Sequence, residues 1–366
     1  MSESANHLTP TPPKRRWPSV LLGVLVSVVA LWLLLRRDFS AVQDELAHAH
    51  YWAVIPCLIV SVIGLWLRSI RWRVLLPGRL SAGHSFHILN VSYFINAVLP
   101  LRVGELARAG LAARLNPPVP VLTSLSTVVI ERLLDTLAVF GLVGITLAIL
   151  PAGFEVGLIG LVLGVGALVG VIVLAVFAAR PDWARLLLDR VVLNGVGRVI
   201  PFFQRPNMQA RLTAWLDHLL DGIAPLASVR VWLLAFAWTV AAWAASVSAG
   251  YVLLFALFDD PTWAAAMAFV ALASFAIAVP AVPGNLGPFE AAVVFALMSA
   301  DLVGELTDPR AIAFALLLHV VNLVTYIGAG LIGLWAEDVK LGDVTRAAQQ
   351  IALGVAQSPK PNPPCA

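Results

Sequence analysis

Ionisable residues interrupt three apolar stretches of this chain, and they are the residues that could perform chemistry. The first stretch, 96–108, contains Arg102, Glu105 and Arg108. Charged groups at bilayer depth cost free energy, so we expect them to face the protein interior or a wet cavity. Guanidinium groups bind phosphate bidentately and keep their charge when buried, so Arg102 and Arg108 are candidate phosphate ligands, with Glu105 balancing their charge. For Arg108 alone, a side chain that extends to the cytoplasmic surface is the simpler interpretation.

The second stretch, 121–150, carries Glu131, Arg132 and Asp135 in an otherwise apolar segment. Three central charges cost about 8–10 kcal/mol on insertion, and the apolar residues return a similar amount, so the segment needs partners for its charges. Glu131 and Asp135 share a helix face at i, i+4, and Arg132 can reach Asp135 at i, i+3. In a purely structural interpretation, Arg132 and Asp135 form a closed pair and Glu131 bonds to a neighbouring helix. Alternatively, Arg132 helps to bind phosphate while the two carboxylates balance charge or carry protons.

The third stretch, 279–290, contains residues that cannot all sit in one unbroken helix: Pro280, Pro283, Gly284, Gly287 and Pro288. Glu290 follows this break, where it could cap the next helix, carry a proton or balance the charge of Arg102. Pro100 and Gly104 interrupt the first stretch in the same way. The N–H groups freed at the next helix start would help to hold an anion.

Further polar residues in apolar surroundings are candidates for lining a cavity: Asn96, Asn285, His319, Asn322 and Tyr326. The last three share one helical face, where hydrogen bonds between helices are the more common role. The sequence contains no HExxH, GxSxG, CxxC or P-loop motif. We therefore expect no metal, cofactor or catalytic nucleophile.

Composition predicts that the elements positioning these residues are helices in a membrane. Of 366 residues, 60% are hydrophobic and 12% are charged, whereas soluble domains carry about 25% charged residues. We therefore predict an all-α polytopic membrane protein. Its net charge of +3 is explained by arginine-rich cytoplasmic loops, so no nucleic acid partner is expected.

A helix needs about 20 apolar residues to cross a bilayer. Six segments come close to or meet this criterion: 18–35, 52–76, 121–150, 156–179, 231–258 and 311–335. The predicted membrane domain covers 14–340 and includes an amphipathic cytoplasmic segment at 180–230. Residues 1–13 and most of the tail at 341–366 are polar or rich in proline, which favours disorder.

Basic residues orient these spans, because cytoplasmic loops are enriched in them. They precede the first span, recur throughout 180–230 and cluster at the end of the second span as Arg68, Arg71, Arg73 and Arg79. The two termini and 180–230 are therefore predicted to be cytoplasmic.

Two further apolar segments, 84–114 and 262–300, are broken near their middles. The predicted orientation requires 84–114 to enter and leave from the cytoplasm and 262–300 to enter and leave from outside. Re-entrant hairpins from opposite faces are typical of transporters with inverted repeats, whose substrates bind near the midplane. The alternative is two ordinary pairs of fully crossing helices.

Three motifs, in this order, resemble the lysylphosphatidylglycerol synthase transmembrane region, also called the flippase-like domain. They are Asn96…Leu99-Pro100…Gly104-Glu105…Arg108, then Glu131-Arg132-x-x-Asp135, then Pro283-Gly-Asn-Leu-Gly287-x-x-Glu290. The resemblance covers roughly residues 15–340. In full-length synthases this domain moves aminoacylated lipid between leaflets, and a soluble domain makes that lipid.

The resemblance implies a lipid flippase or scramblase of the bacterial inner membrane and argues against transferase activity, since no soluble transferase domain is present in this sequence. Proteins linked to hopanoid lipids or lipid-linked sugars are also similar, so the cargo stays open. The rival hypothesis is a membrane subunit that scaffolds a lipid-modifying enzyme through 180–230. A third, an integral membrane transferase, lacks the expected soluble part.

Overall fold

The computed structural model describes residues 39–76, 80–99, 103–149, 176–191, 206–278 and 286–344, with Arg346 and isolated positions from 165 to 173. Within these residues, every regular element is helical, which confirms the predicted all-α class. The expected span at 18–35, most of the one at 156–179 and nearly all of the two predicted tails lie outside them.

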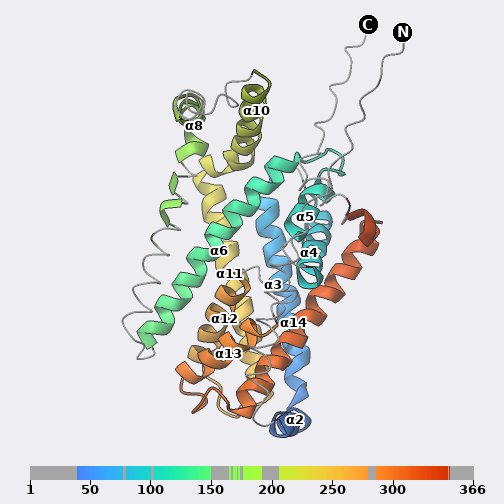
Figure 1. Ribbon diagram of the computed structural model, residues 1–366, viewed down its shortest axis with the longest axis vertical. Coiled ribbons are helices and arrows are strands. Elements are labelled where there is room, and N and C mark those ends of the chain that lie inside the picture. Colours follow the sequence, from blue (N-terminus) through green and yellow to red (C-terminus); the bar gives the residue numbers. More distant parts are fainter. Residues whose placement is uncertain are drawn as a thin grey trace, which may run out of the picture.

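Among the described residues, three helices are long and apolar enough to cross a bilayer: Tyr51–Leu75, Val229–Leu254 and Pro309–Ala336. They contain 25, 26 and 28 residues, or about 38–42 Å at 1.5 Å per residue, which exceeds a hydrocarbon core of about 30 Å. They coincide with three of the predicted spans. In Figure 1 they are α3 (Val54–Leu75, with a short 3₁₀ turn before it), α11 (Val229–Leu254) and α14 (Pro309–Ala336).

A fourth long helix, α6 (Val121–Ile149), carries the charged trio of the second stretch. It runs obliquely along the bundle in Figure 1, and it packs on α5, α10 and α12. It corresponds to the span predicted at 121–150 and carries the three charges within an otherwise apolar sequence. The residues that neutralise them come from neighbouring helices.

Two pairs of shorter helices lie toward opposite ends of the long helices in Figure 1. One pair is α4 (Ala82–Val98) with α5 (Gly104–Ala112), and the other is α12 (Trp263–Ala278) with α13 (Pro288–Ser299). The members of each pair pack against each other. At 1.5 Å per residue, these helices are about 14–26 Å long, shorter than the hydrocarbon core.

Local chemistry fixes where the short helices begin. The Ser81 side chain accepts a hydrogen bond from His84 N at 3.1 Å and caps α4. The N–H of Gly104 donates to Asn96 Oδ1 at 2.8 Å, which joins the start of α5 to α4. A Cβ on Gly104 would overlap the Ser92 carbonyl oxygen and the Asn96 side chain. Only glycine therefore fits this close approach.

The amphipathic segment contributes α8 (Pro181–Leu187) and α10 (Pro206–Ile223), which lie beyond one end of the long helices in Figure 1. Leu220 and Ile223 of α10 are buried, whereas Trp215 is 54% exposed. Trp183 of α8 is similarly exposed. At the opposite end lies α2 (Phe39–His48).

The contact between α4 and α14 depends on Gly330, so we expect Gly330→Ala to destabilise the protein. A Cβ on Gly330 would overlap Phe94 and approach Asn90 O at 3.1 Å. Overpacking of this kind costs about 1–3 kcal/mol. At Gly328, on the same helix, a Cβ would meet no neighbouring atom within 4 Å. Gly328→Ala is therefore the matched control, expected to be neutral or stabilising by up to about 1 kcal/mol. Unfolding in detergent measures both, and equal stabilities would contradict the packing shown.

Candidate functional site: a charged cavity among the helices

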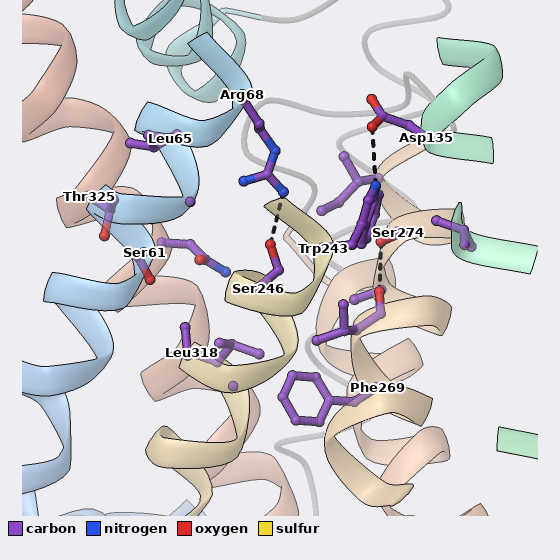
Figure 2. Close-up of a pocket in the computed structure, with 18 of the residues that line it drawn as sticks. Ser61, Leu65, Arg68, Asp135, Trp243, Ser246, Phe269, Ser274, Leu318 and Thr325 are labelled. Atoms are coloured by element: carbon purple, nitrogen blue, oxygen red, sulfur yellow. Dashed lines mark hydrogen bonds between the residues drawn. The ribbon is translucent and has the colours of Figure 1, made fainter. Parts of the chain in front are cut away.

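A cavity of about 310 Å³ lies among α3, α4, α6, α11, α12, α13 and α14. Figure 2 shows part of its lining, with side chains from several helices pointing toward a common space. Apolar residues such as Leu65, Phe269 and Leu318 form much of its wall. Its polar lining residues include Ser61, Arg68, Tyr93, Arg132, Asp135, Trp243, Ser246, Asn322 and Tyr326. Apolar walls with a few placed polar groups are typical of ligand sites.

Asp135 on α6 is bound from two other helices. Arg71 on α3 donates to Oδ1 at 2.5 Å and to Oδ2 at 3.2 Å, and Trp243 Nε1 on α11 donates to Oδ1 at 3.1 Å. Arg71 also donates to Thr239 Oγ1 at 3.2 Å. The two-point contact is the geometry in which guanidinium and carboxylate bind most strongly.

Arg71 corrects one expectation from the sequence, which counted it in a cytoplasmic basic cluster. Its side chain is 2% exposed and neutralises Asp135. The sequence also allowed Arg132 to pair with Asp135 along the same helix. Arg132 Nη2 instead lies 3.2 Å from Glu105 Oε1 on α5. This pair is the more open one, with side chains 45% and 24% exposed.

Arg108 forms a fully buried ion pair with Glu131. Its Nη2 donates to Glu131 Oε2 at 2.8 Å, and both side chains are 3% exposed. The Arg108 guanidinium also lies 4.7 Å from the centre of the Trp72 ring, within cation–π range. Burial corrects the interpretation that Arg108 extends to the surface. The carboxylates of Glu105, Glu131 and Asp135 therefore each face an arginine from a different helix.

Arg68 is a charged cavity residue that the sequence analysis did not predict as a site residue. Its Nη2 donates to Ser246 Oγ at 2.9 Å, and its guanidinium carbon lies 5.9 Å from the Trp243 ring centre. Among the described residues, no carboxylate lies within 4.0 Å of it. The signal was present in the sequence: Cys57, Ser61 and Arg68 recur at helical spacing, and all three line the cavity.

The third stretch forms a second polar contact beside the cavity. Glu290 Oε2 accepts from Gly287 N at 2.6 Å, so this carboxylate caps α13, one of the roles that the sequence suggested. Gly287 has φ 93°, a conformation that favours glycine. Glu290 Oε1 lies 2.6 Å from His319 Nδ1, with both side chains buried. The neighbouring Phe289 lines the cavity.

The remaining candidates divide between the cavity and its surroundings. Asn322 and Tyr326 line the cavity, and the Tyr326 ring stacks on Tyr93 at 5.5 Å between centroids. His319, predicted on the same face, contacts Glu290 instead. Asn96 binds the start of α5. The other candidates lie outside the described residues: Pro100, Arg102, Pro283, Gly284 and Asn285.

Comparison with known proteins identifies a relative and a protein family. The chain is similar to a protein named glycosyltransferase AglD from Haloferax volcanii, with 28% identity over 351 residues. The alignment covers 88% of this chain and 55% of that relative, so the chain spans about half the relative's length. Residues 20–330 match the lysylphosphatidylglycerol synthase transmembrane region. The chain therefore belongs to the family of membrane domains defined by that region.

Proposed function

We propose that the protein translocates an anionic phospholipid or another lipid phosphate between membrane leaflets, by flipping or scrambling. The observation that carries this proposal is a polar, charged cavity inside helices whose outer surfaces are apolar. Ile55 on α3, Leu233 on α11 and Val324 on α14 are all more than half exposed. A lipid can place its head group in such a cavity while its acyl chains stay in the hydrocarbon.

The two short helix pairs are proposed to be re-entrant hairpins that gate the cavity from opposite faces. Their short lengths and their positions toward opposite ends of the bundle support this arrangement. Hairpins of this kind bring helix ends and broken backbone to the midplane, where transporters bind substrate. The proposed setting is the bacterial inner membrane, with both chain termini cytoplasmic.

The proposed phosphate ligands are Arg102, Arg108 and Arg132. Arg108 and Arg132 already face Glu131 and Glu105. A lipid phosphate would therefore replace a carboxylate beside its arginine. Exchanging one anion for another avoids leaving a buried arginine unpaired, which is the costly alternative.

The other carboxylates have proposed roles in balancing charge or carrying protons as the anion moves. Asp135 lines the cavity, and Glu290 follows the lining residue Phe289 in sequence and contacts His319. No residue is assigned a catalytic role, and we propose that the chain itself transfers no group. The relative's name points to glycosyl transfer by that protein. A lipid phosphate carrying sugar is accordingly a cargo of the same chemical class.

The alternative function is a membrane subunit that scaffolds a lipid-modifying enzyme, such as an aminoacyl-phosphatidylglycerol synthase. The observation that favours it is the exposure of Trp183 and Trp215 on the amphipathic helices α8 and α10. Exposed tryptophans are typical of surfaces that contact a partner or a membrane interface.

Leaflet exchange in proteoliposomes separates the two functions. We expect Arg102→Ala and Glu290→Gln to slow exchange of fluorescent phosphatidylglycerol at least tenfold, while Trp183→Ser with Trp215→Ser leaves it near wild type. All proteins should first be matched for folding by gel filtration and melting temperature. A scaffold predicts the reverse: cavity variants that support lipid modification in cells, and tryptophan variants that do not.

A further inference from the structure

The charges around the cavity are unequally paired. Among the residues that the structure describes, three charged side chains line it: Arg68, Arg132 and Asp135. Arg132 faces Glu105, and Asp135 is neutralised by Arg71. In the part of the chain that the structure describes, Arg68 has no carboxylate within 4.0 Å. Of the described residues, Arg68, Arg71 and Arg132 therefore outnumber the carboxylates that face them, Asp135 and Glu105, and this excess of positive charge at the cavity attracts an anion.

The Arg68 guanidinium is held in place from two directions on α11. Ser246 Oγ accepts from its Nη2 at 2.9 Å, and the same hydroxyl donates to Ala242 O at 3.1 Å. Trp243 lies beside the guanidinium, and its ring nitrogen is itself bonded to Asp135. Figure 2 shows Arg68 and Ser246 meeting across the space between α3 and α11. An arginine positioned in this way is prepared for binding and loses little conformational freedom when an anion arrives.

Close packing of α3 on α11 fixes this geometry. A Cβ on Gly64 would lie 3.6 Å from the Ala245 Cβ and 4.0 Å from Ala242 O. Small residues at this contact let the two backbones approach each other, as is common between membrane helices. The approach places Arg68, one turn further along α3, opposite Ser246.

We propose that Arg68 and Ser246 also bind the phosphate of the lipid head group, in addition to the arginines proposed above. The identification of the anion as part of a lipid rests on the proposed function. Arg68 can accept phosphate without displacing a carboxylate, whereas Arg108 and Arg132 must exchange one. The hydroxyl of Ser246 can turn to donate to a phosphate oxygen.

The size of the cavity restricts the head group. Its volume of about 310 Å³ is at the lower end of the range of about 300–1,000 Å³ for ligand pockets. It accommodates a phosphate with a small polar substituent such as glycerol or a single sugar. Apolar residues such as Phe269, Val270 and Leu318 form part of the lining and offer no side-chain hydrogen bonds to a longer sugar chain. The acyl chains remain outside.

Binding to the full-length protein in detergent tests the site without requiring transport. The probes are dihexanoyl-phosphatidylglycerol, inorganic phosphate and uncharged dihexanoylglycerol. We expect Arg68→Gln to weaken binding of the phosphatidylglycerol at least tenfold. Arg68→Lys should weaken it less, because lysine keeps the positive charge but cannot form the two parallel hydrogen bonds of a guanidinium. Arg73→Gln, on the same helix with an exposed side chain, is the matched control and should bind as wild type does.

The other probes identify what is recognised. Arg68-dependent binding of both phosphatidylglycerol and inorganic phosphate assigns recognition to the phosphate group, and binding of phosphatidylglycerol alone assigns it to the lipid head group as a whole. The proposal is overturned if wild type does not bind phosphatidylglycerol, if Arg68→Gln and Arg68→Lys bind it as tightly as wild type, or if dihexanoylglycerol binds equally well. Melting temperatures show which variants are folded. If Arg68→Gln is unfolded, Arg68→Lys and Ser246→Ala are compared with wild type in its place.

Transport and binding can fail separately. Arg68-dependent binding without leaflet exchange would support the site and reject translocation. Leaflet exchange that proceeds at the wild-type rate in folded Arg68→Gln would support translocation and reject the site.

Discussion

Glu131→Ala is expected to lower the free energy of unfolding by about 3–5 kcal/mol, because it leaves Arg108 as an uncompensated buried charge. Both side chains are 3% exposed and are joined at 2.8 Å. Arg108 would keep its contact with the Trp72 ring, but a cation–π contact is worth only about 0.5–2 kcal/mol. Unfolding by denaturant in a mild detergent measures the loss.

Two controls show whether burial is the cause. Replacing both partners by apolar residues of similar size, as in Arg108→Met with Glu131→Leu, should recover most of the lost stability. Glu105→Ala removes the partner of Arg132 in the more exposed pair and should cost about 1 kcal/mol or less. A Glu131→Ala protein as stable as Glu105→Ala would show that Arg108 and Glu131 are not buried together.

Arg71→Gln is expected to cause a loss of similar size. Arg71 gives Asp135 two hydrogen bonds, and without them this carboxylate would keep only the bond from Trp243. Asp135 is 18% exposed, so water from the cavity offsets part of the penalty. We therefore expect a loss of about 3 kcal/mol, at the lower end of the range for broken buried pairs.

The matched control lies on the same helix. Arg73 is exposed, and its Nε donates to the Leu80 carbonyl oxygen at 3.2 Å. Arg73→Gln should therefore change the free energy of unfolding by about 1 kcal/mol or less. A sequence-based interpretation that places both arginines in one cytoplasmic cluster predicts equal, small effects. The two variants measured side by side decide between these interpretations.

Hydropathy predicted the long helices well because bilayer thickness sets their length. The spans expected at 52–76, 231–258 and 311–335 correspond to α3, α11 and α14 within a few residues. The role of Glu290 as a helix cap could also be predicted from the sequence, because Gly287 and Pro288 mark the start of a helix and Glu290 lies three residues after Gly287.

The sequence spacing of the charged residues could not predict which arginine pairs with which carboxylate. Arg71 and Asp135 are 64 residues apart, and Arg108 and Glu131 are 23 apart. Which arginine faces which carboxylate depends on how α3, α5 and α6 pack. Local i, i+3 and i, i+4 rules describe only contacts within one helix. They could not place Arg132 beside Glu105.

Arg68 was missed for a different reason. The tendency of cytoplasmic loops to be positive explained every arginine at the end of α3 at once, and this removed the need to ask which way each one points. Helical spacing separates them: Arg68 follows Ser61 on the face that lines the cavity, whereas Arg73 is exposed. Arg68 could have been identified by asking which helix face each arginine near the helix end lies on, as well as how many arginines there are.

Lipid translocation itself is tested most directly by leaflet exchange in proteoliposomes of the full-length protein. Fluorescent phosphatidylglycerol and a fluorescent lipid with no phosphate are followed in parallel, against empty liposomes prepared in the same detergent. We predict that the protein accelerates exchange of phosphatidylglycerol at least tenfold and has a much smaller effect on the lipid without phosphate. Exchange of both lipids at the rate of empty liposomes, by protein shown to be folded, would contradict it.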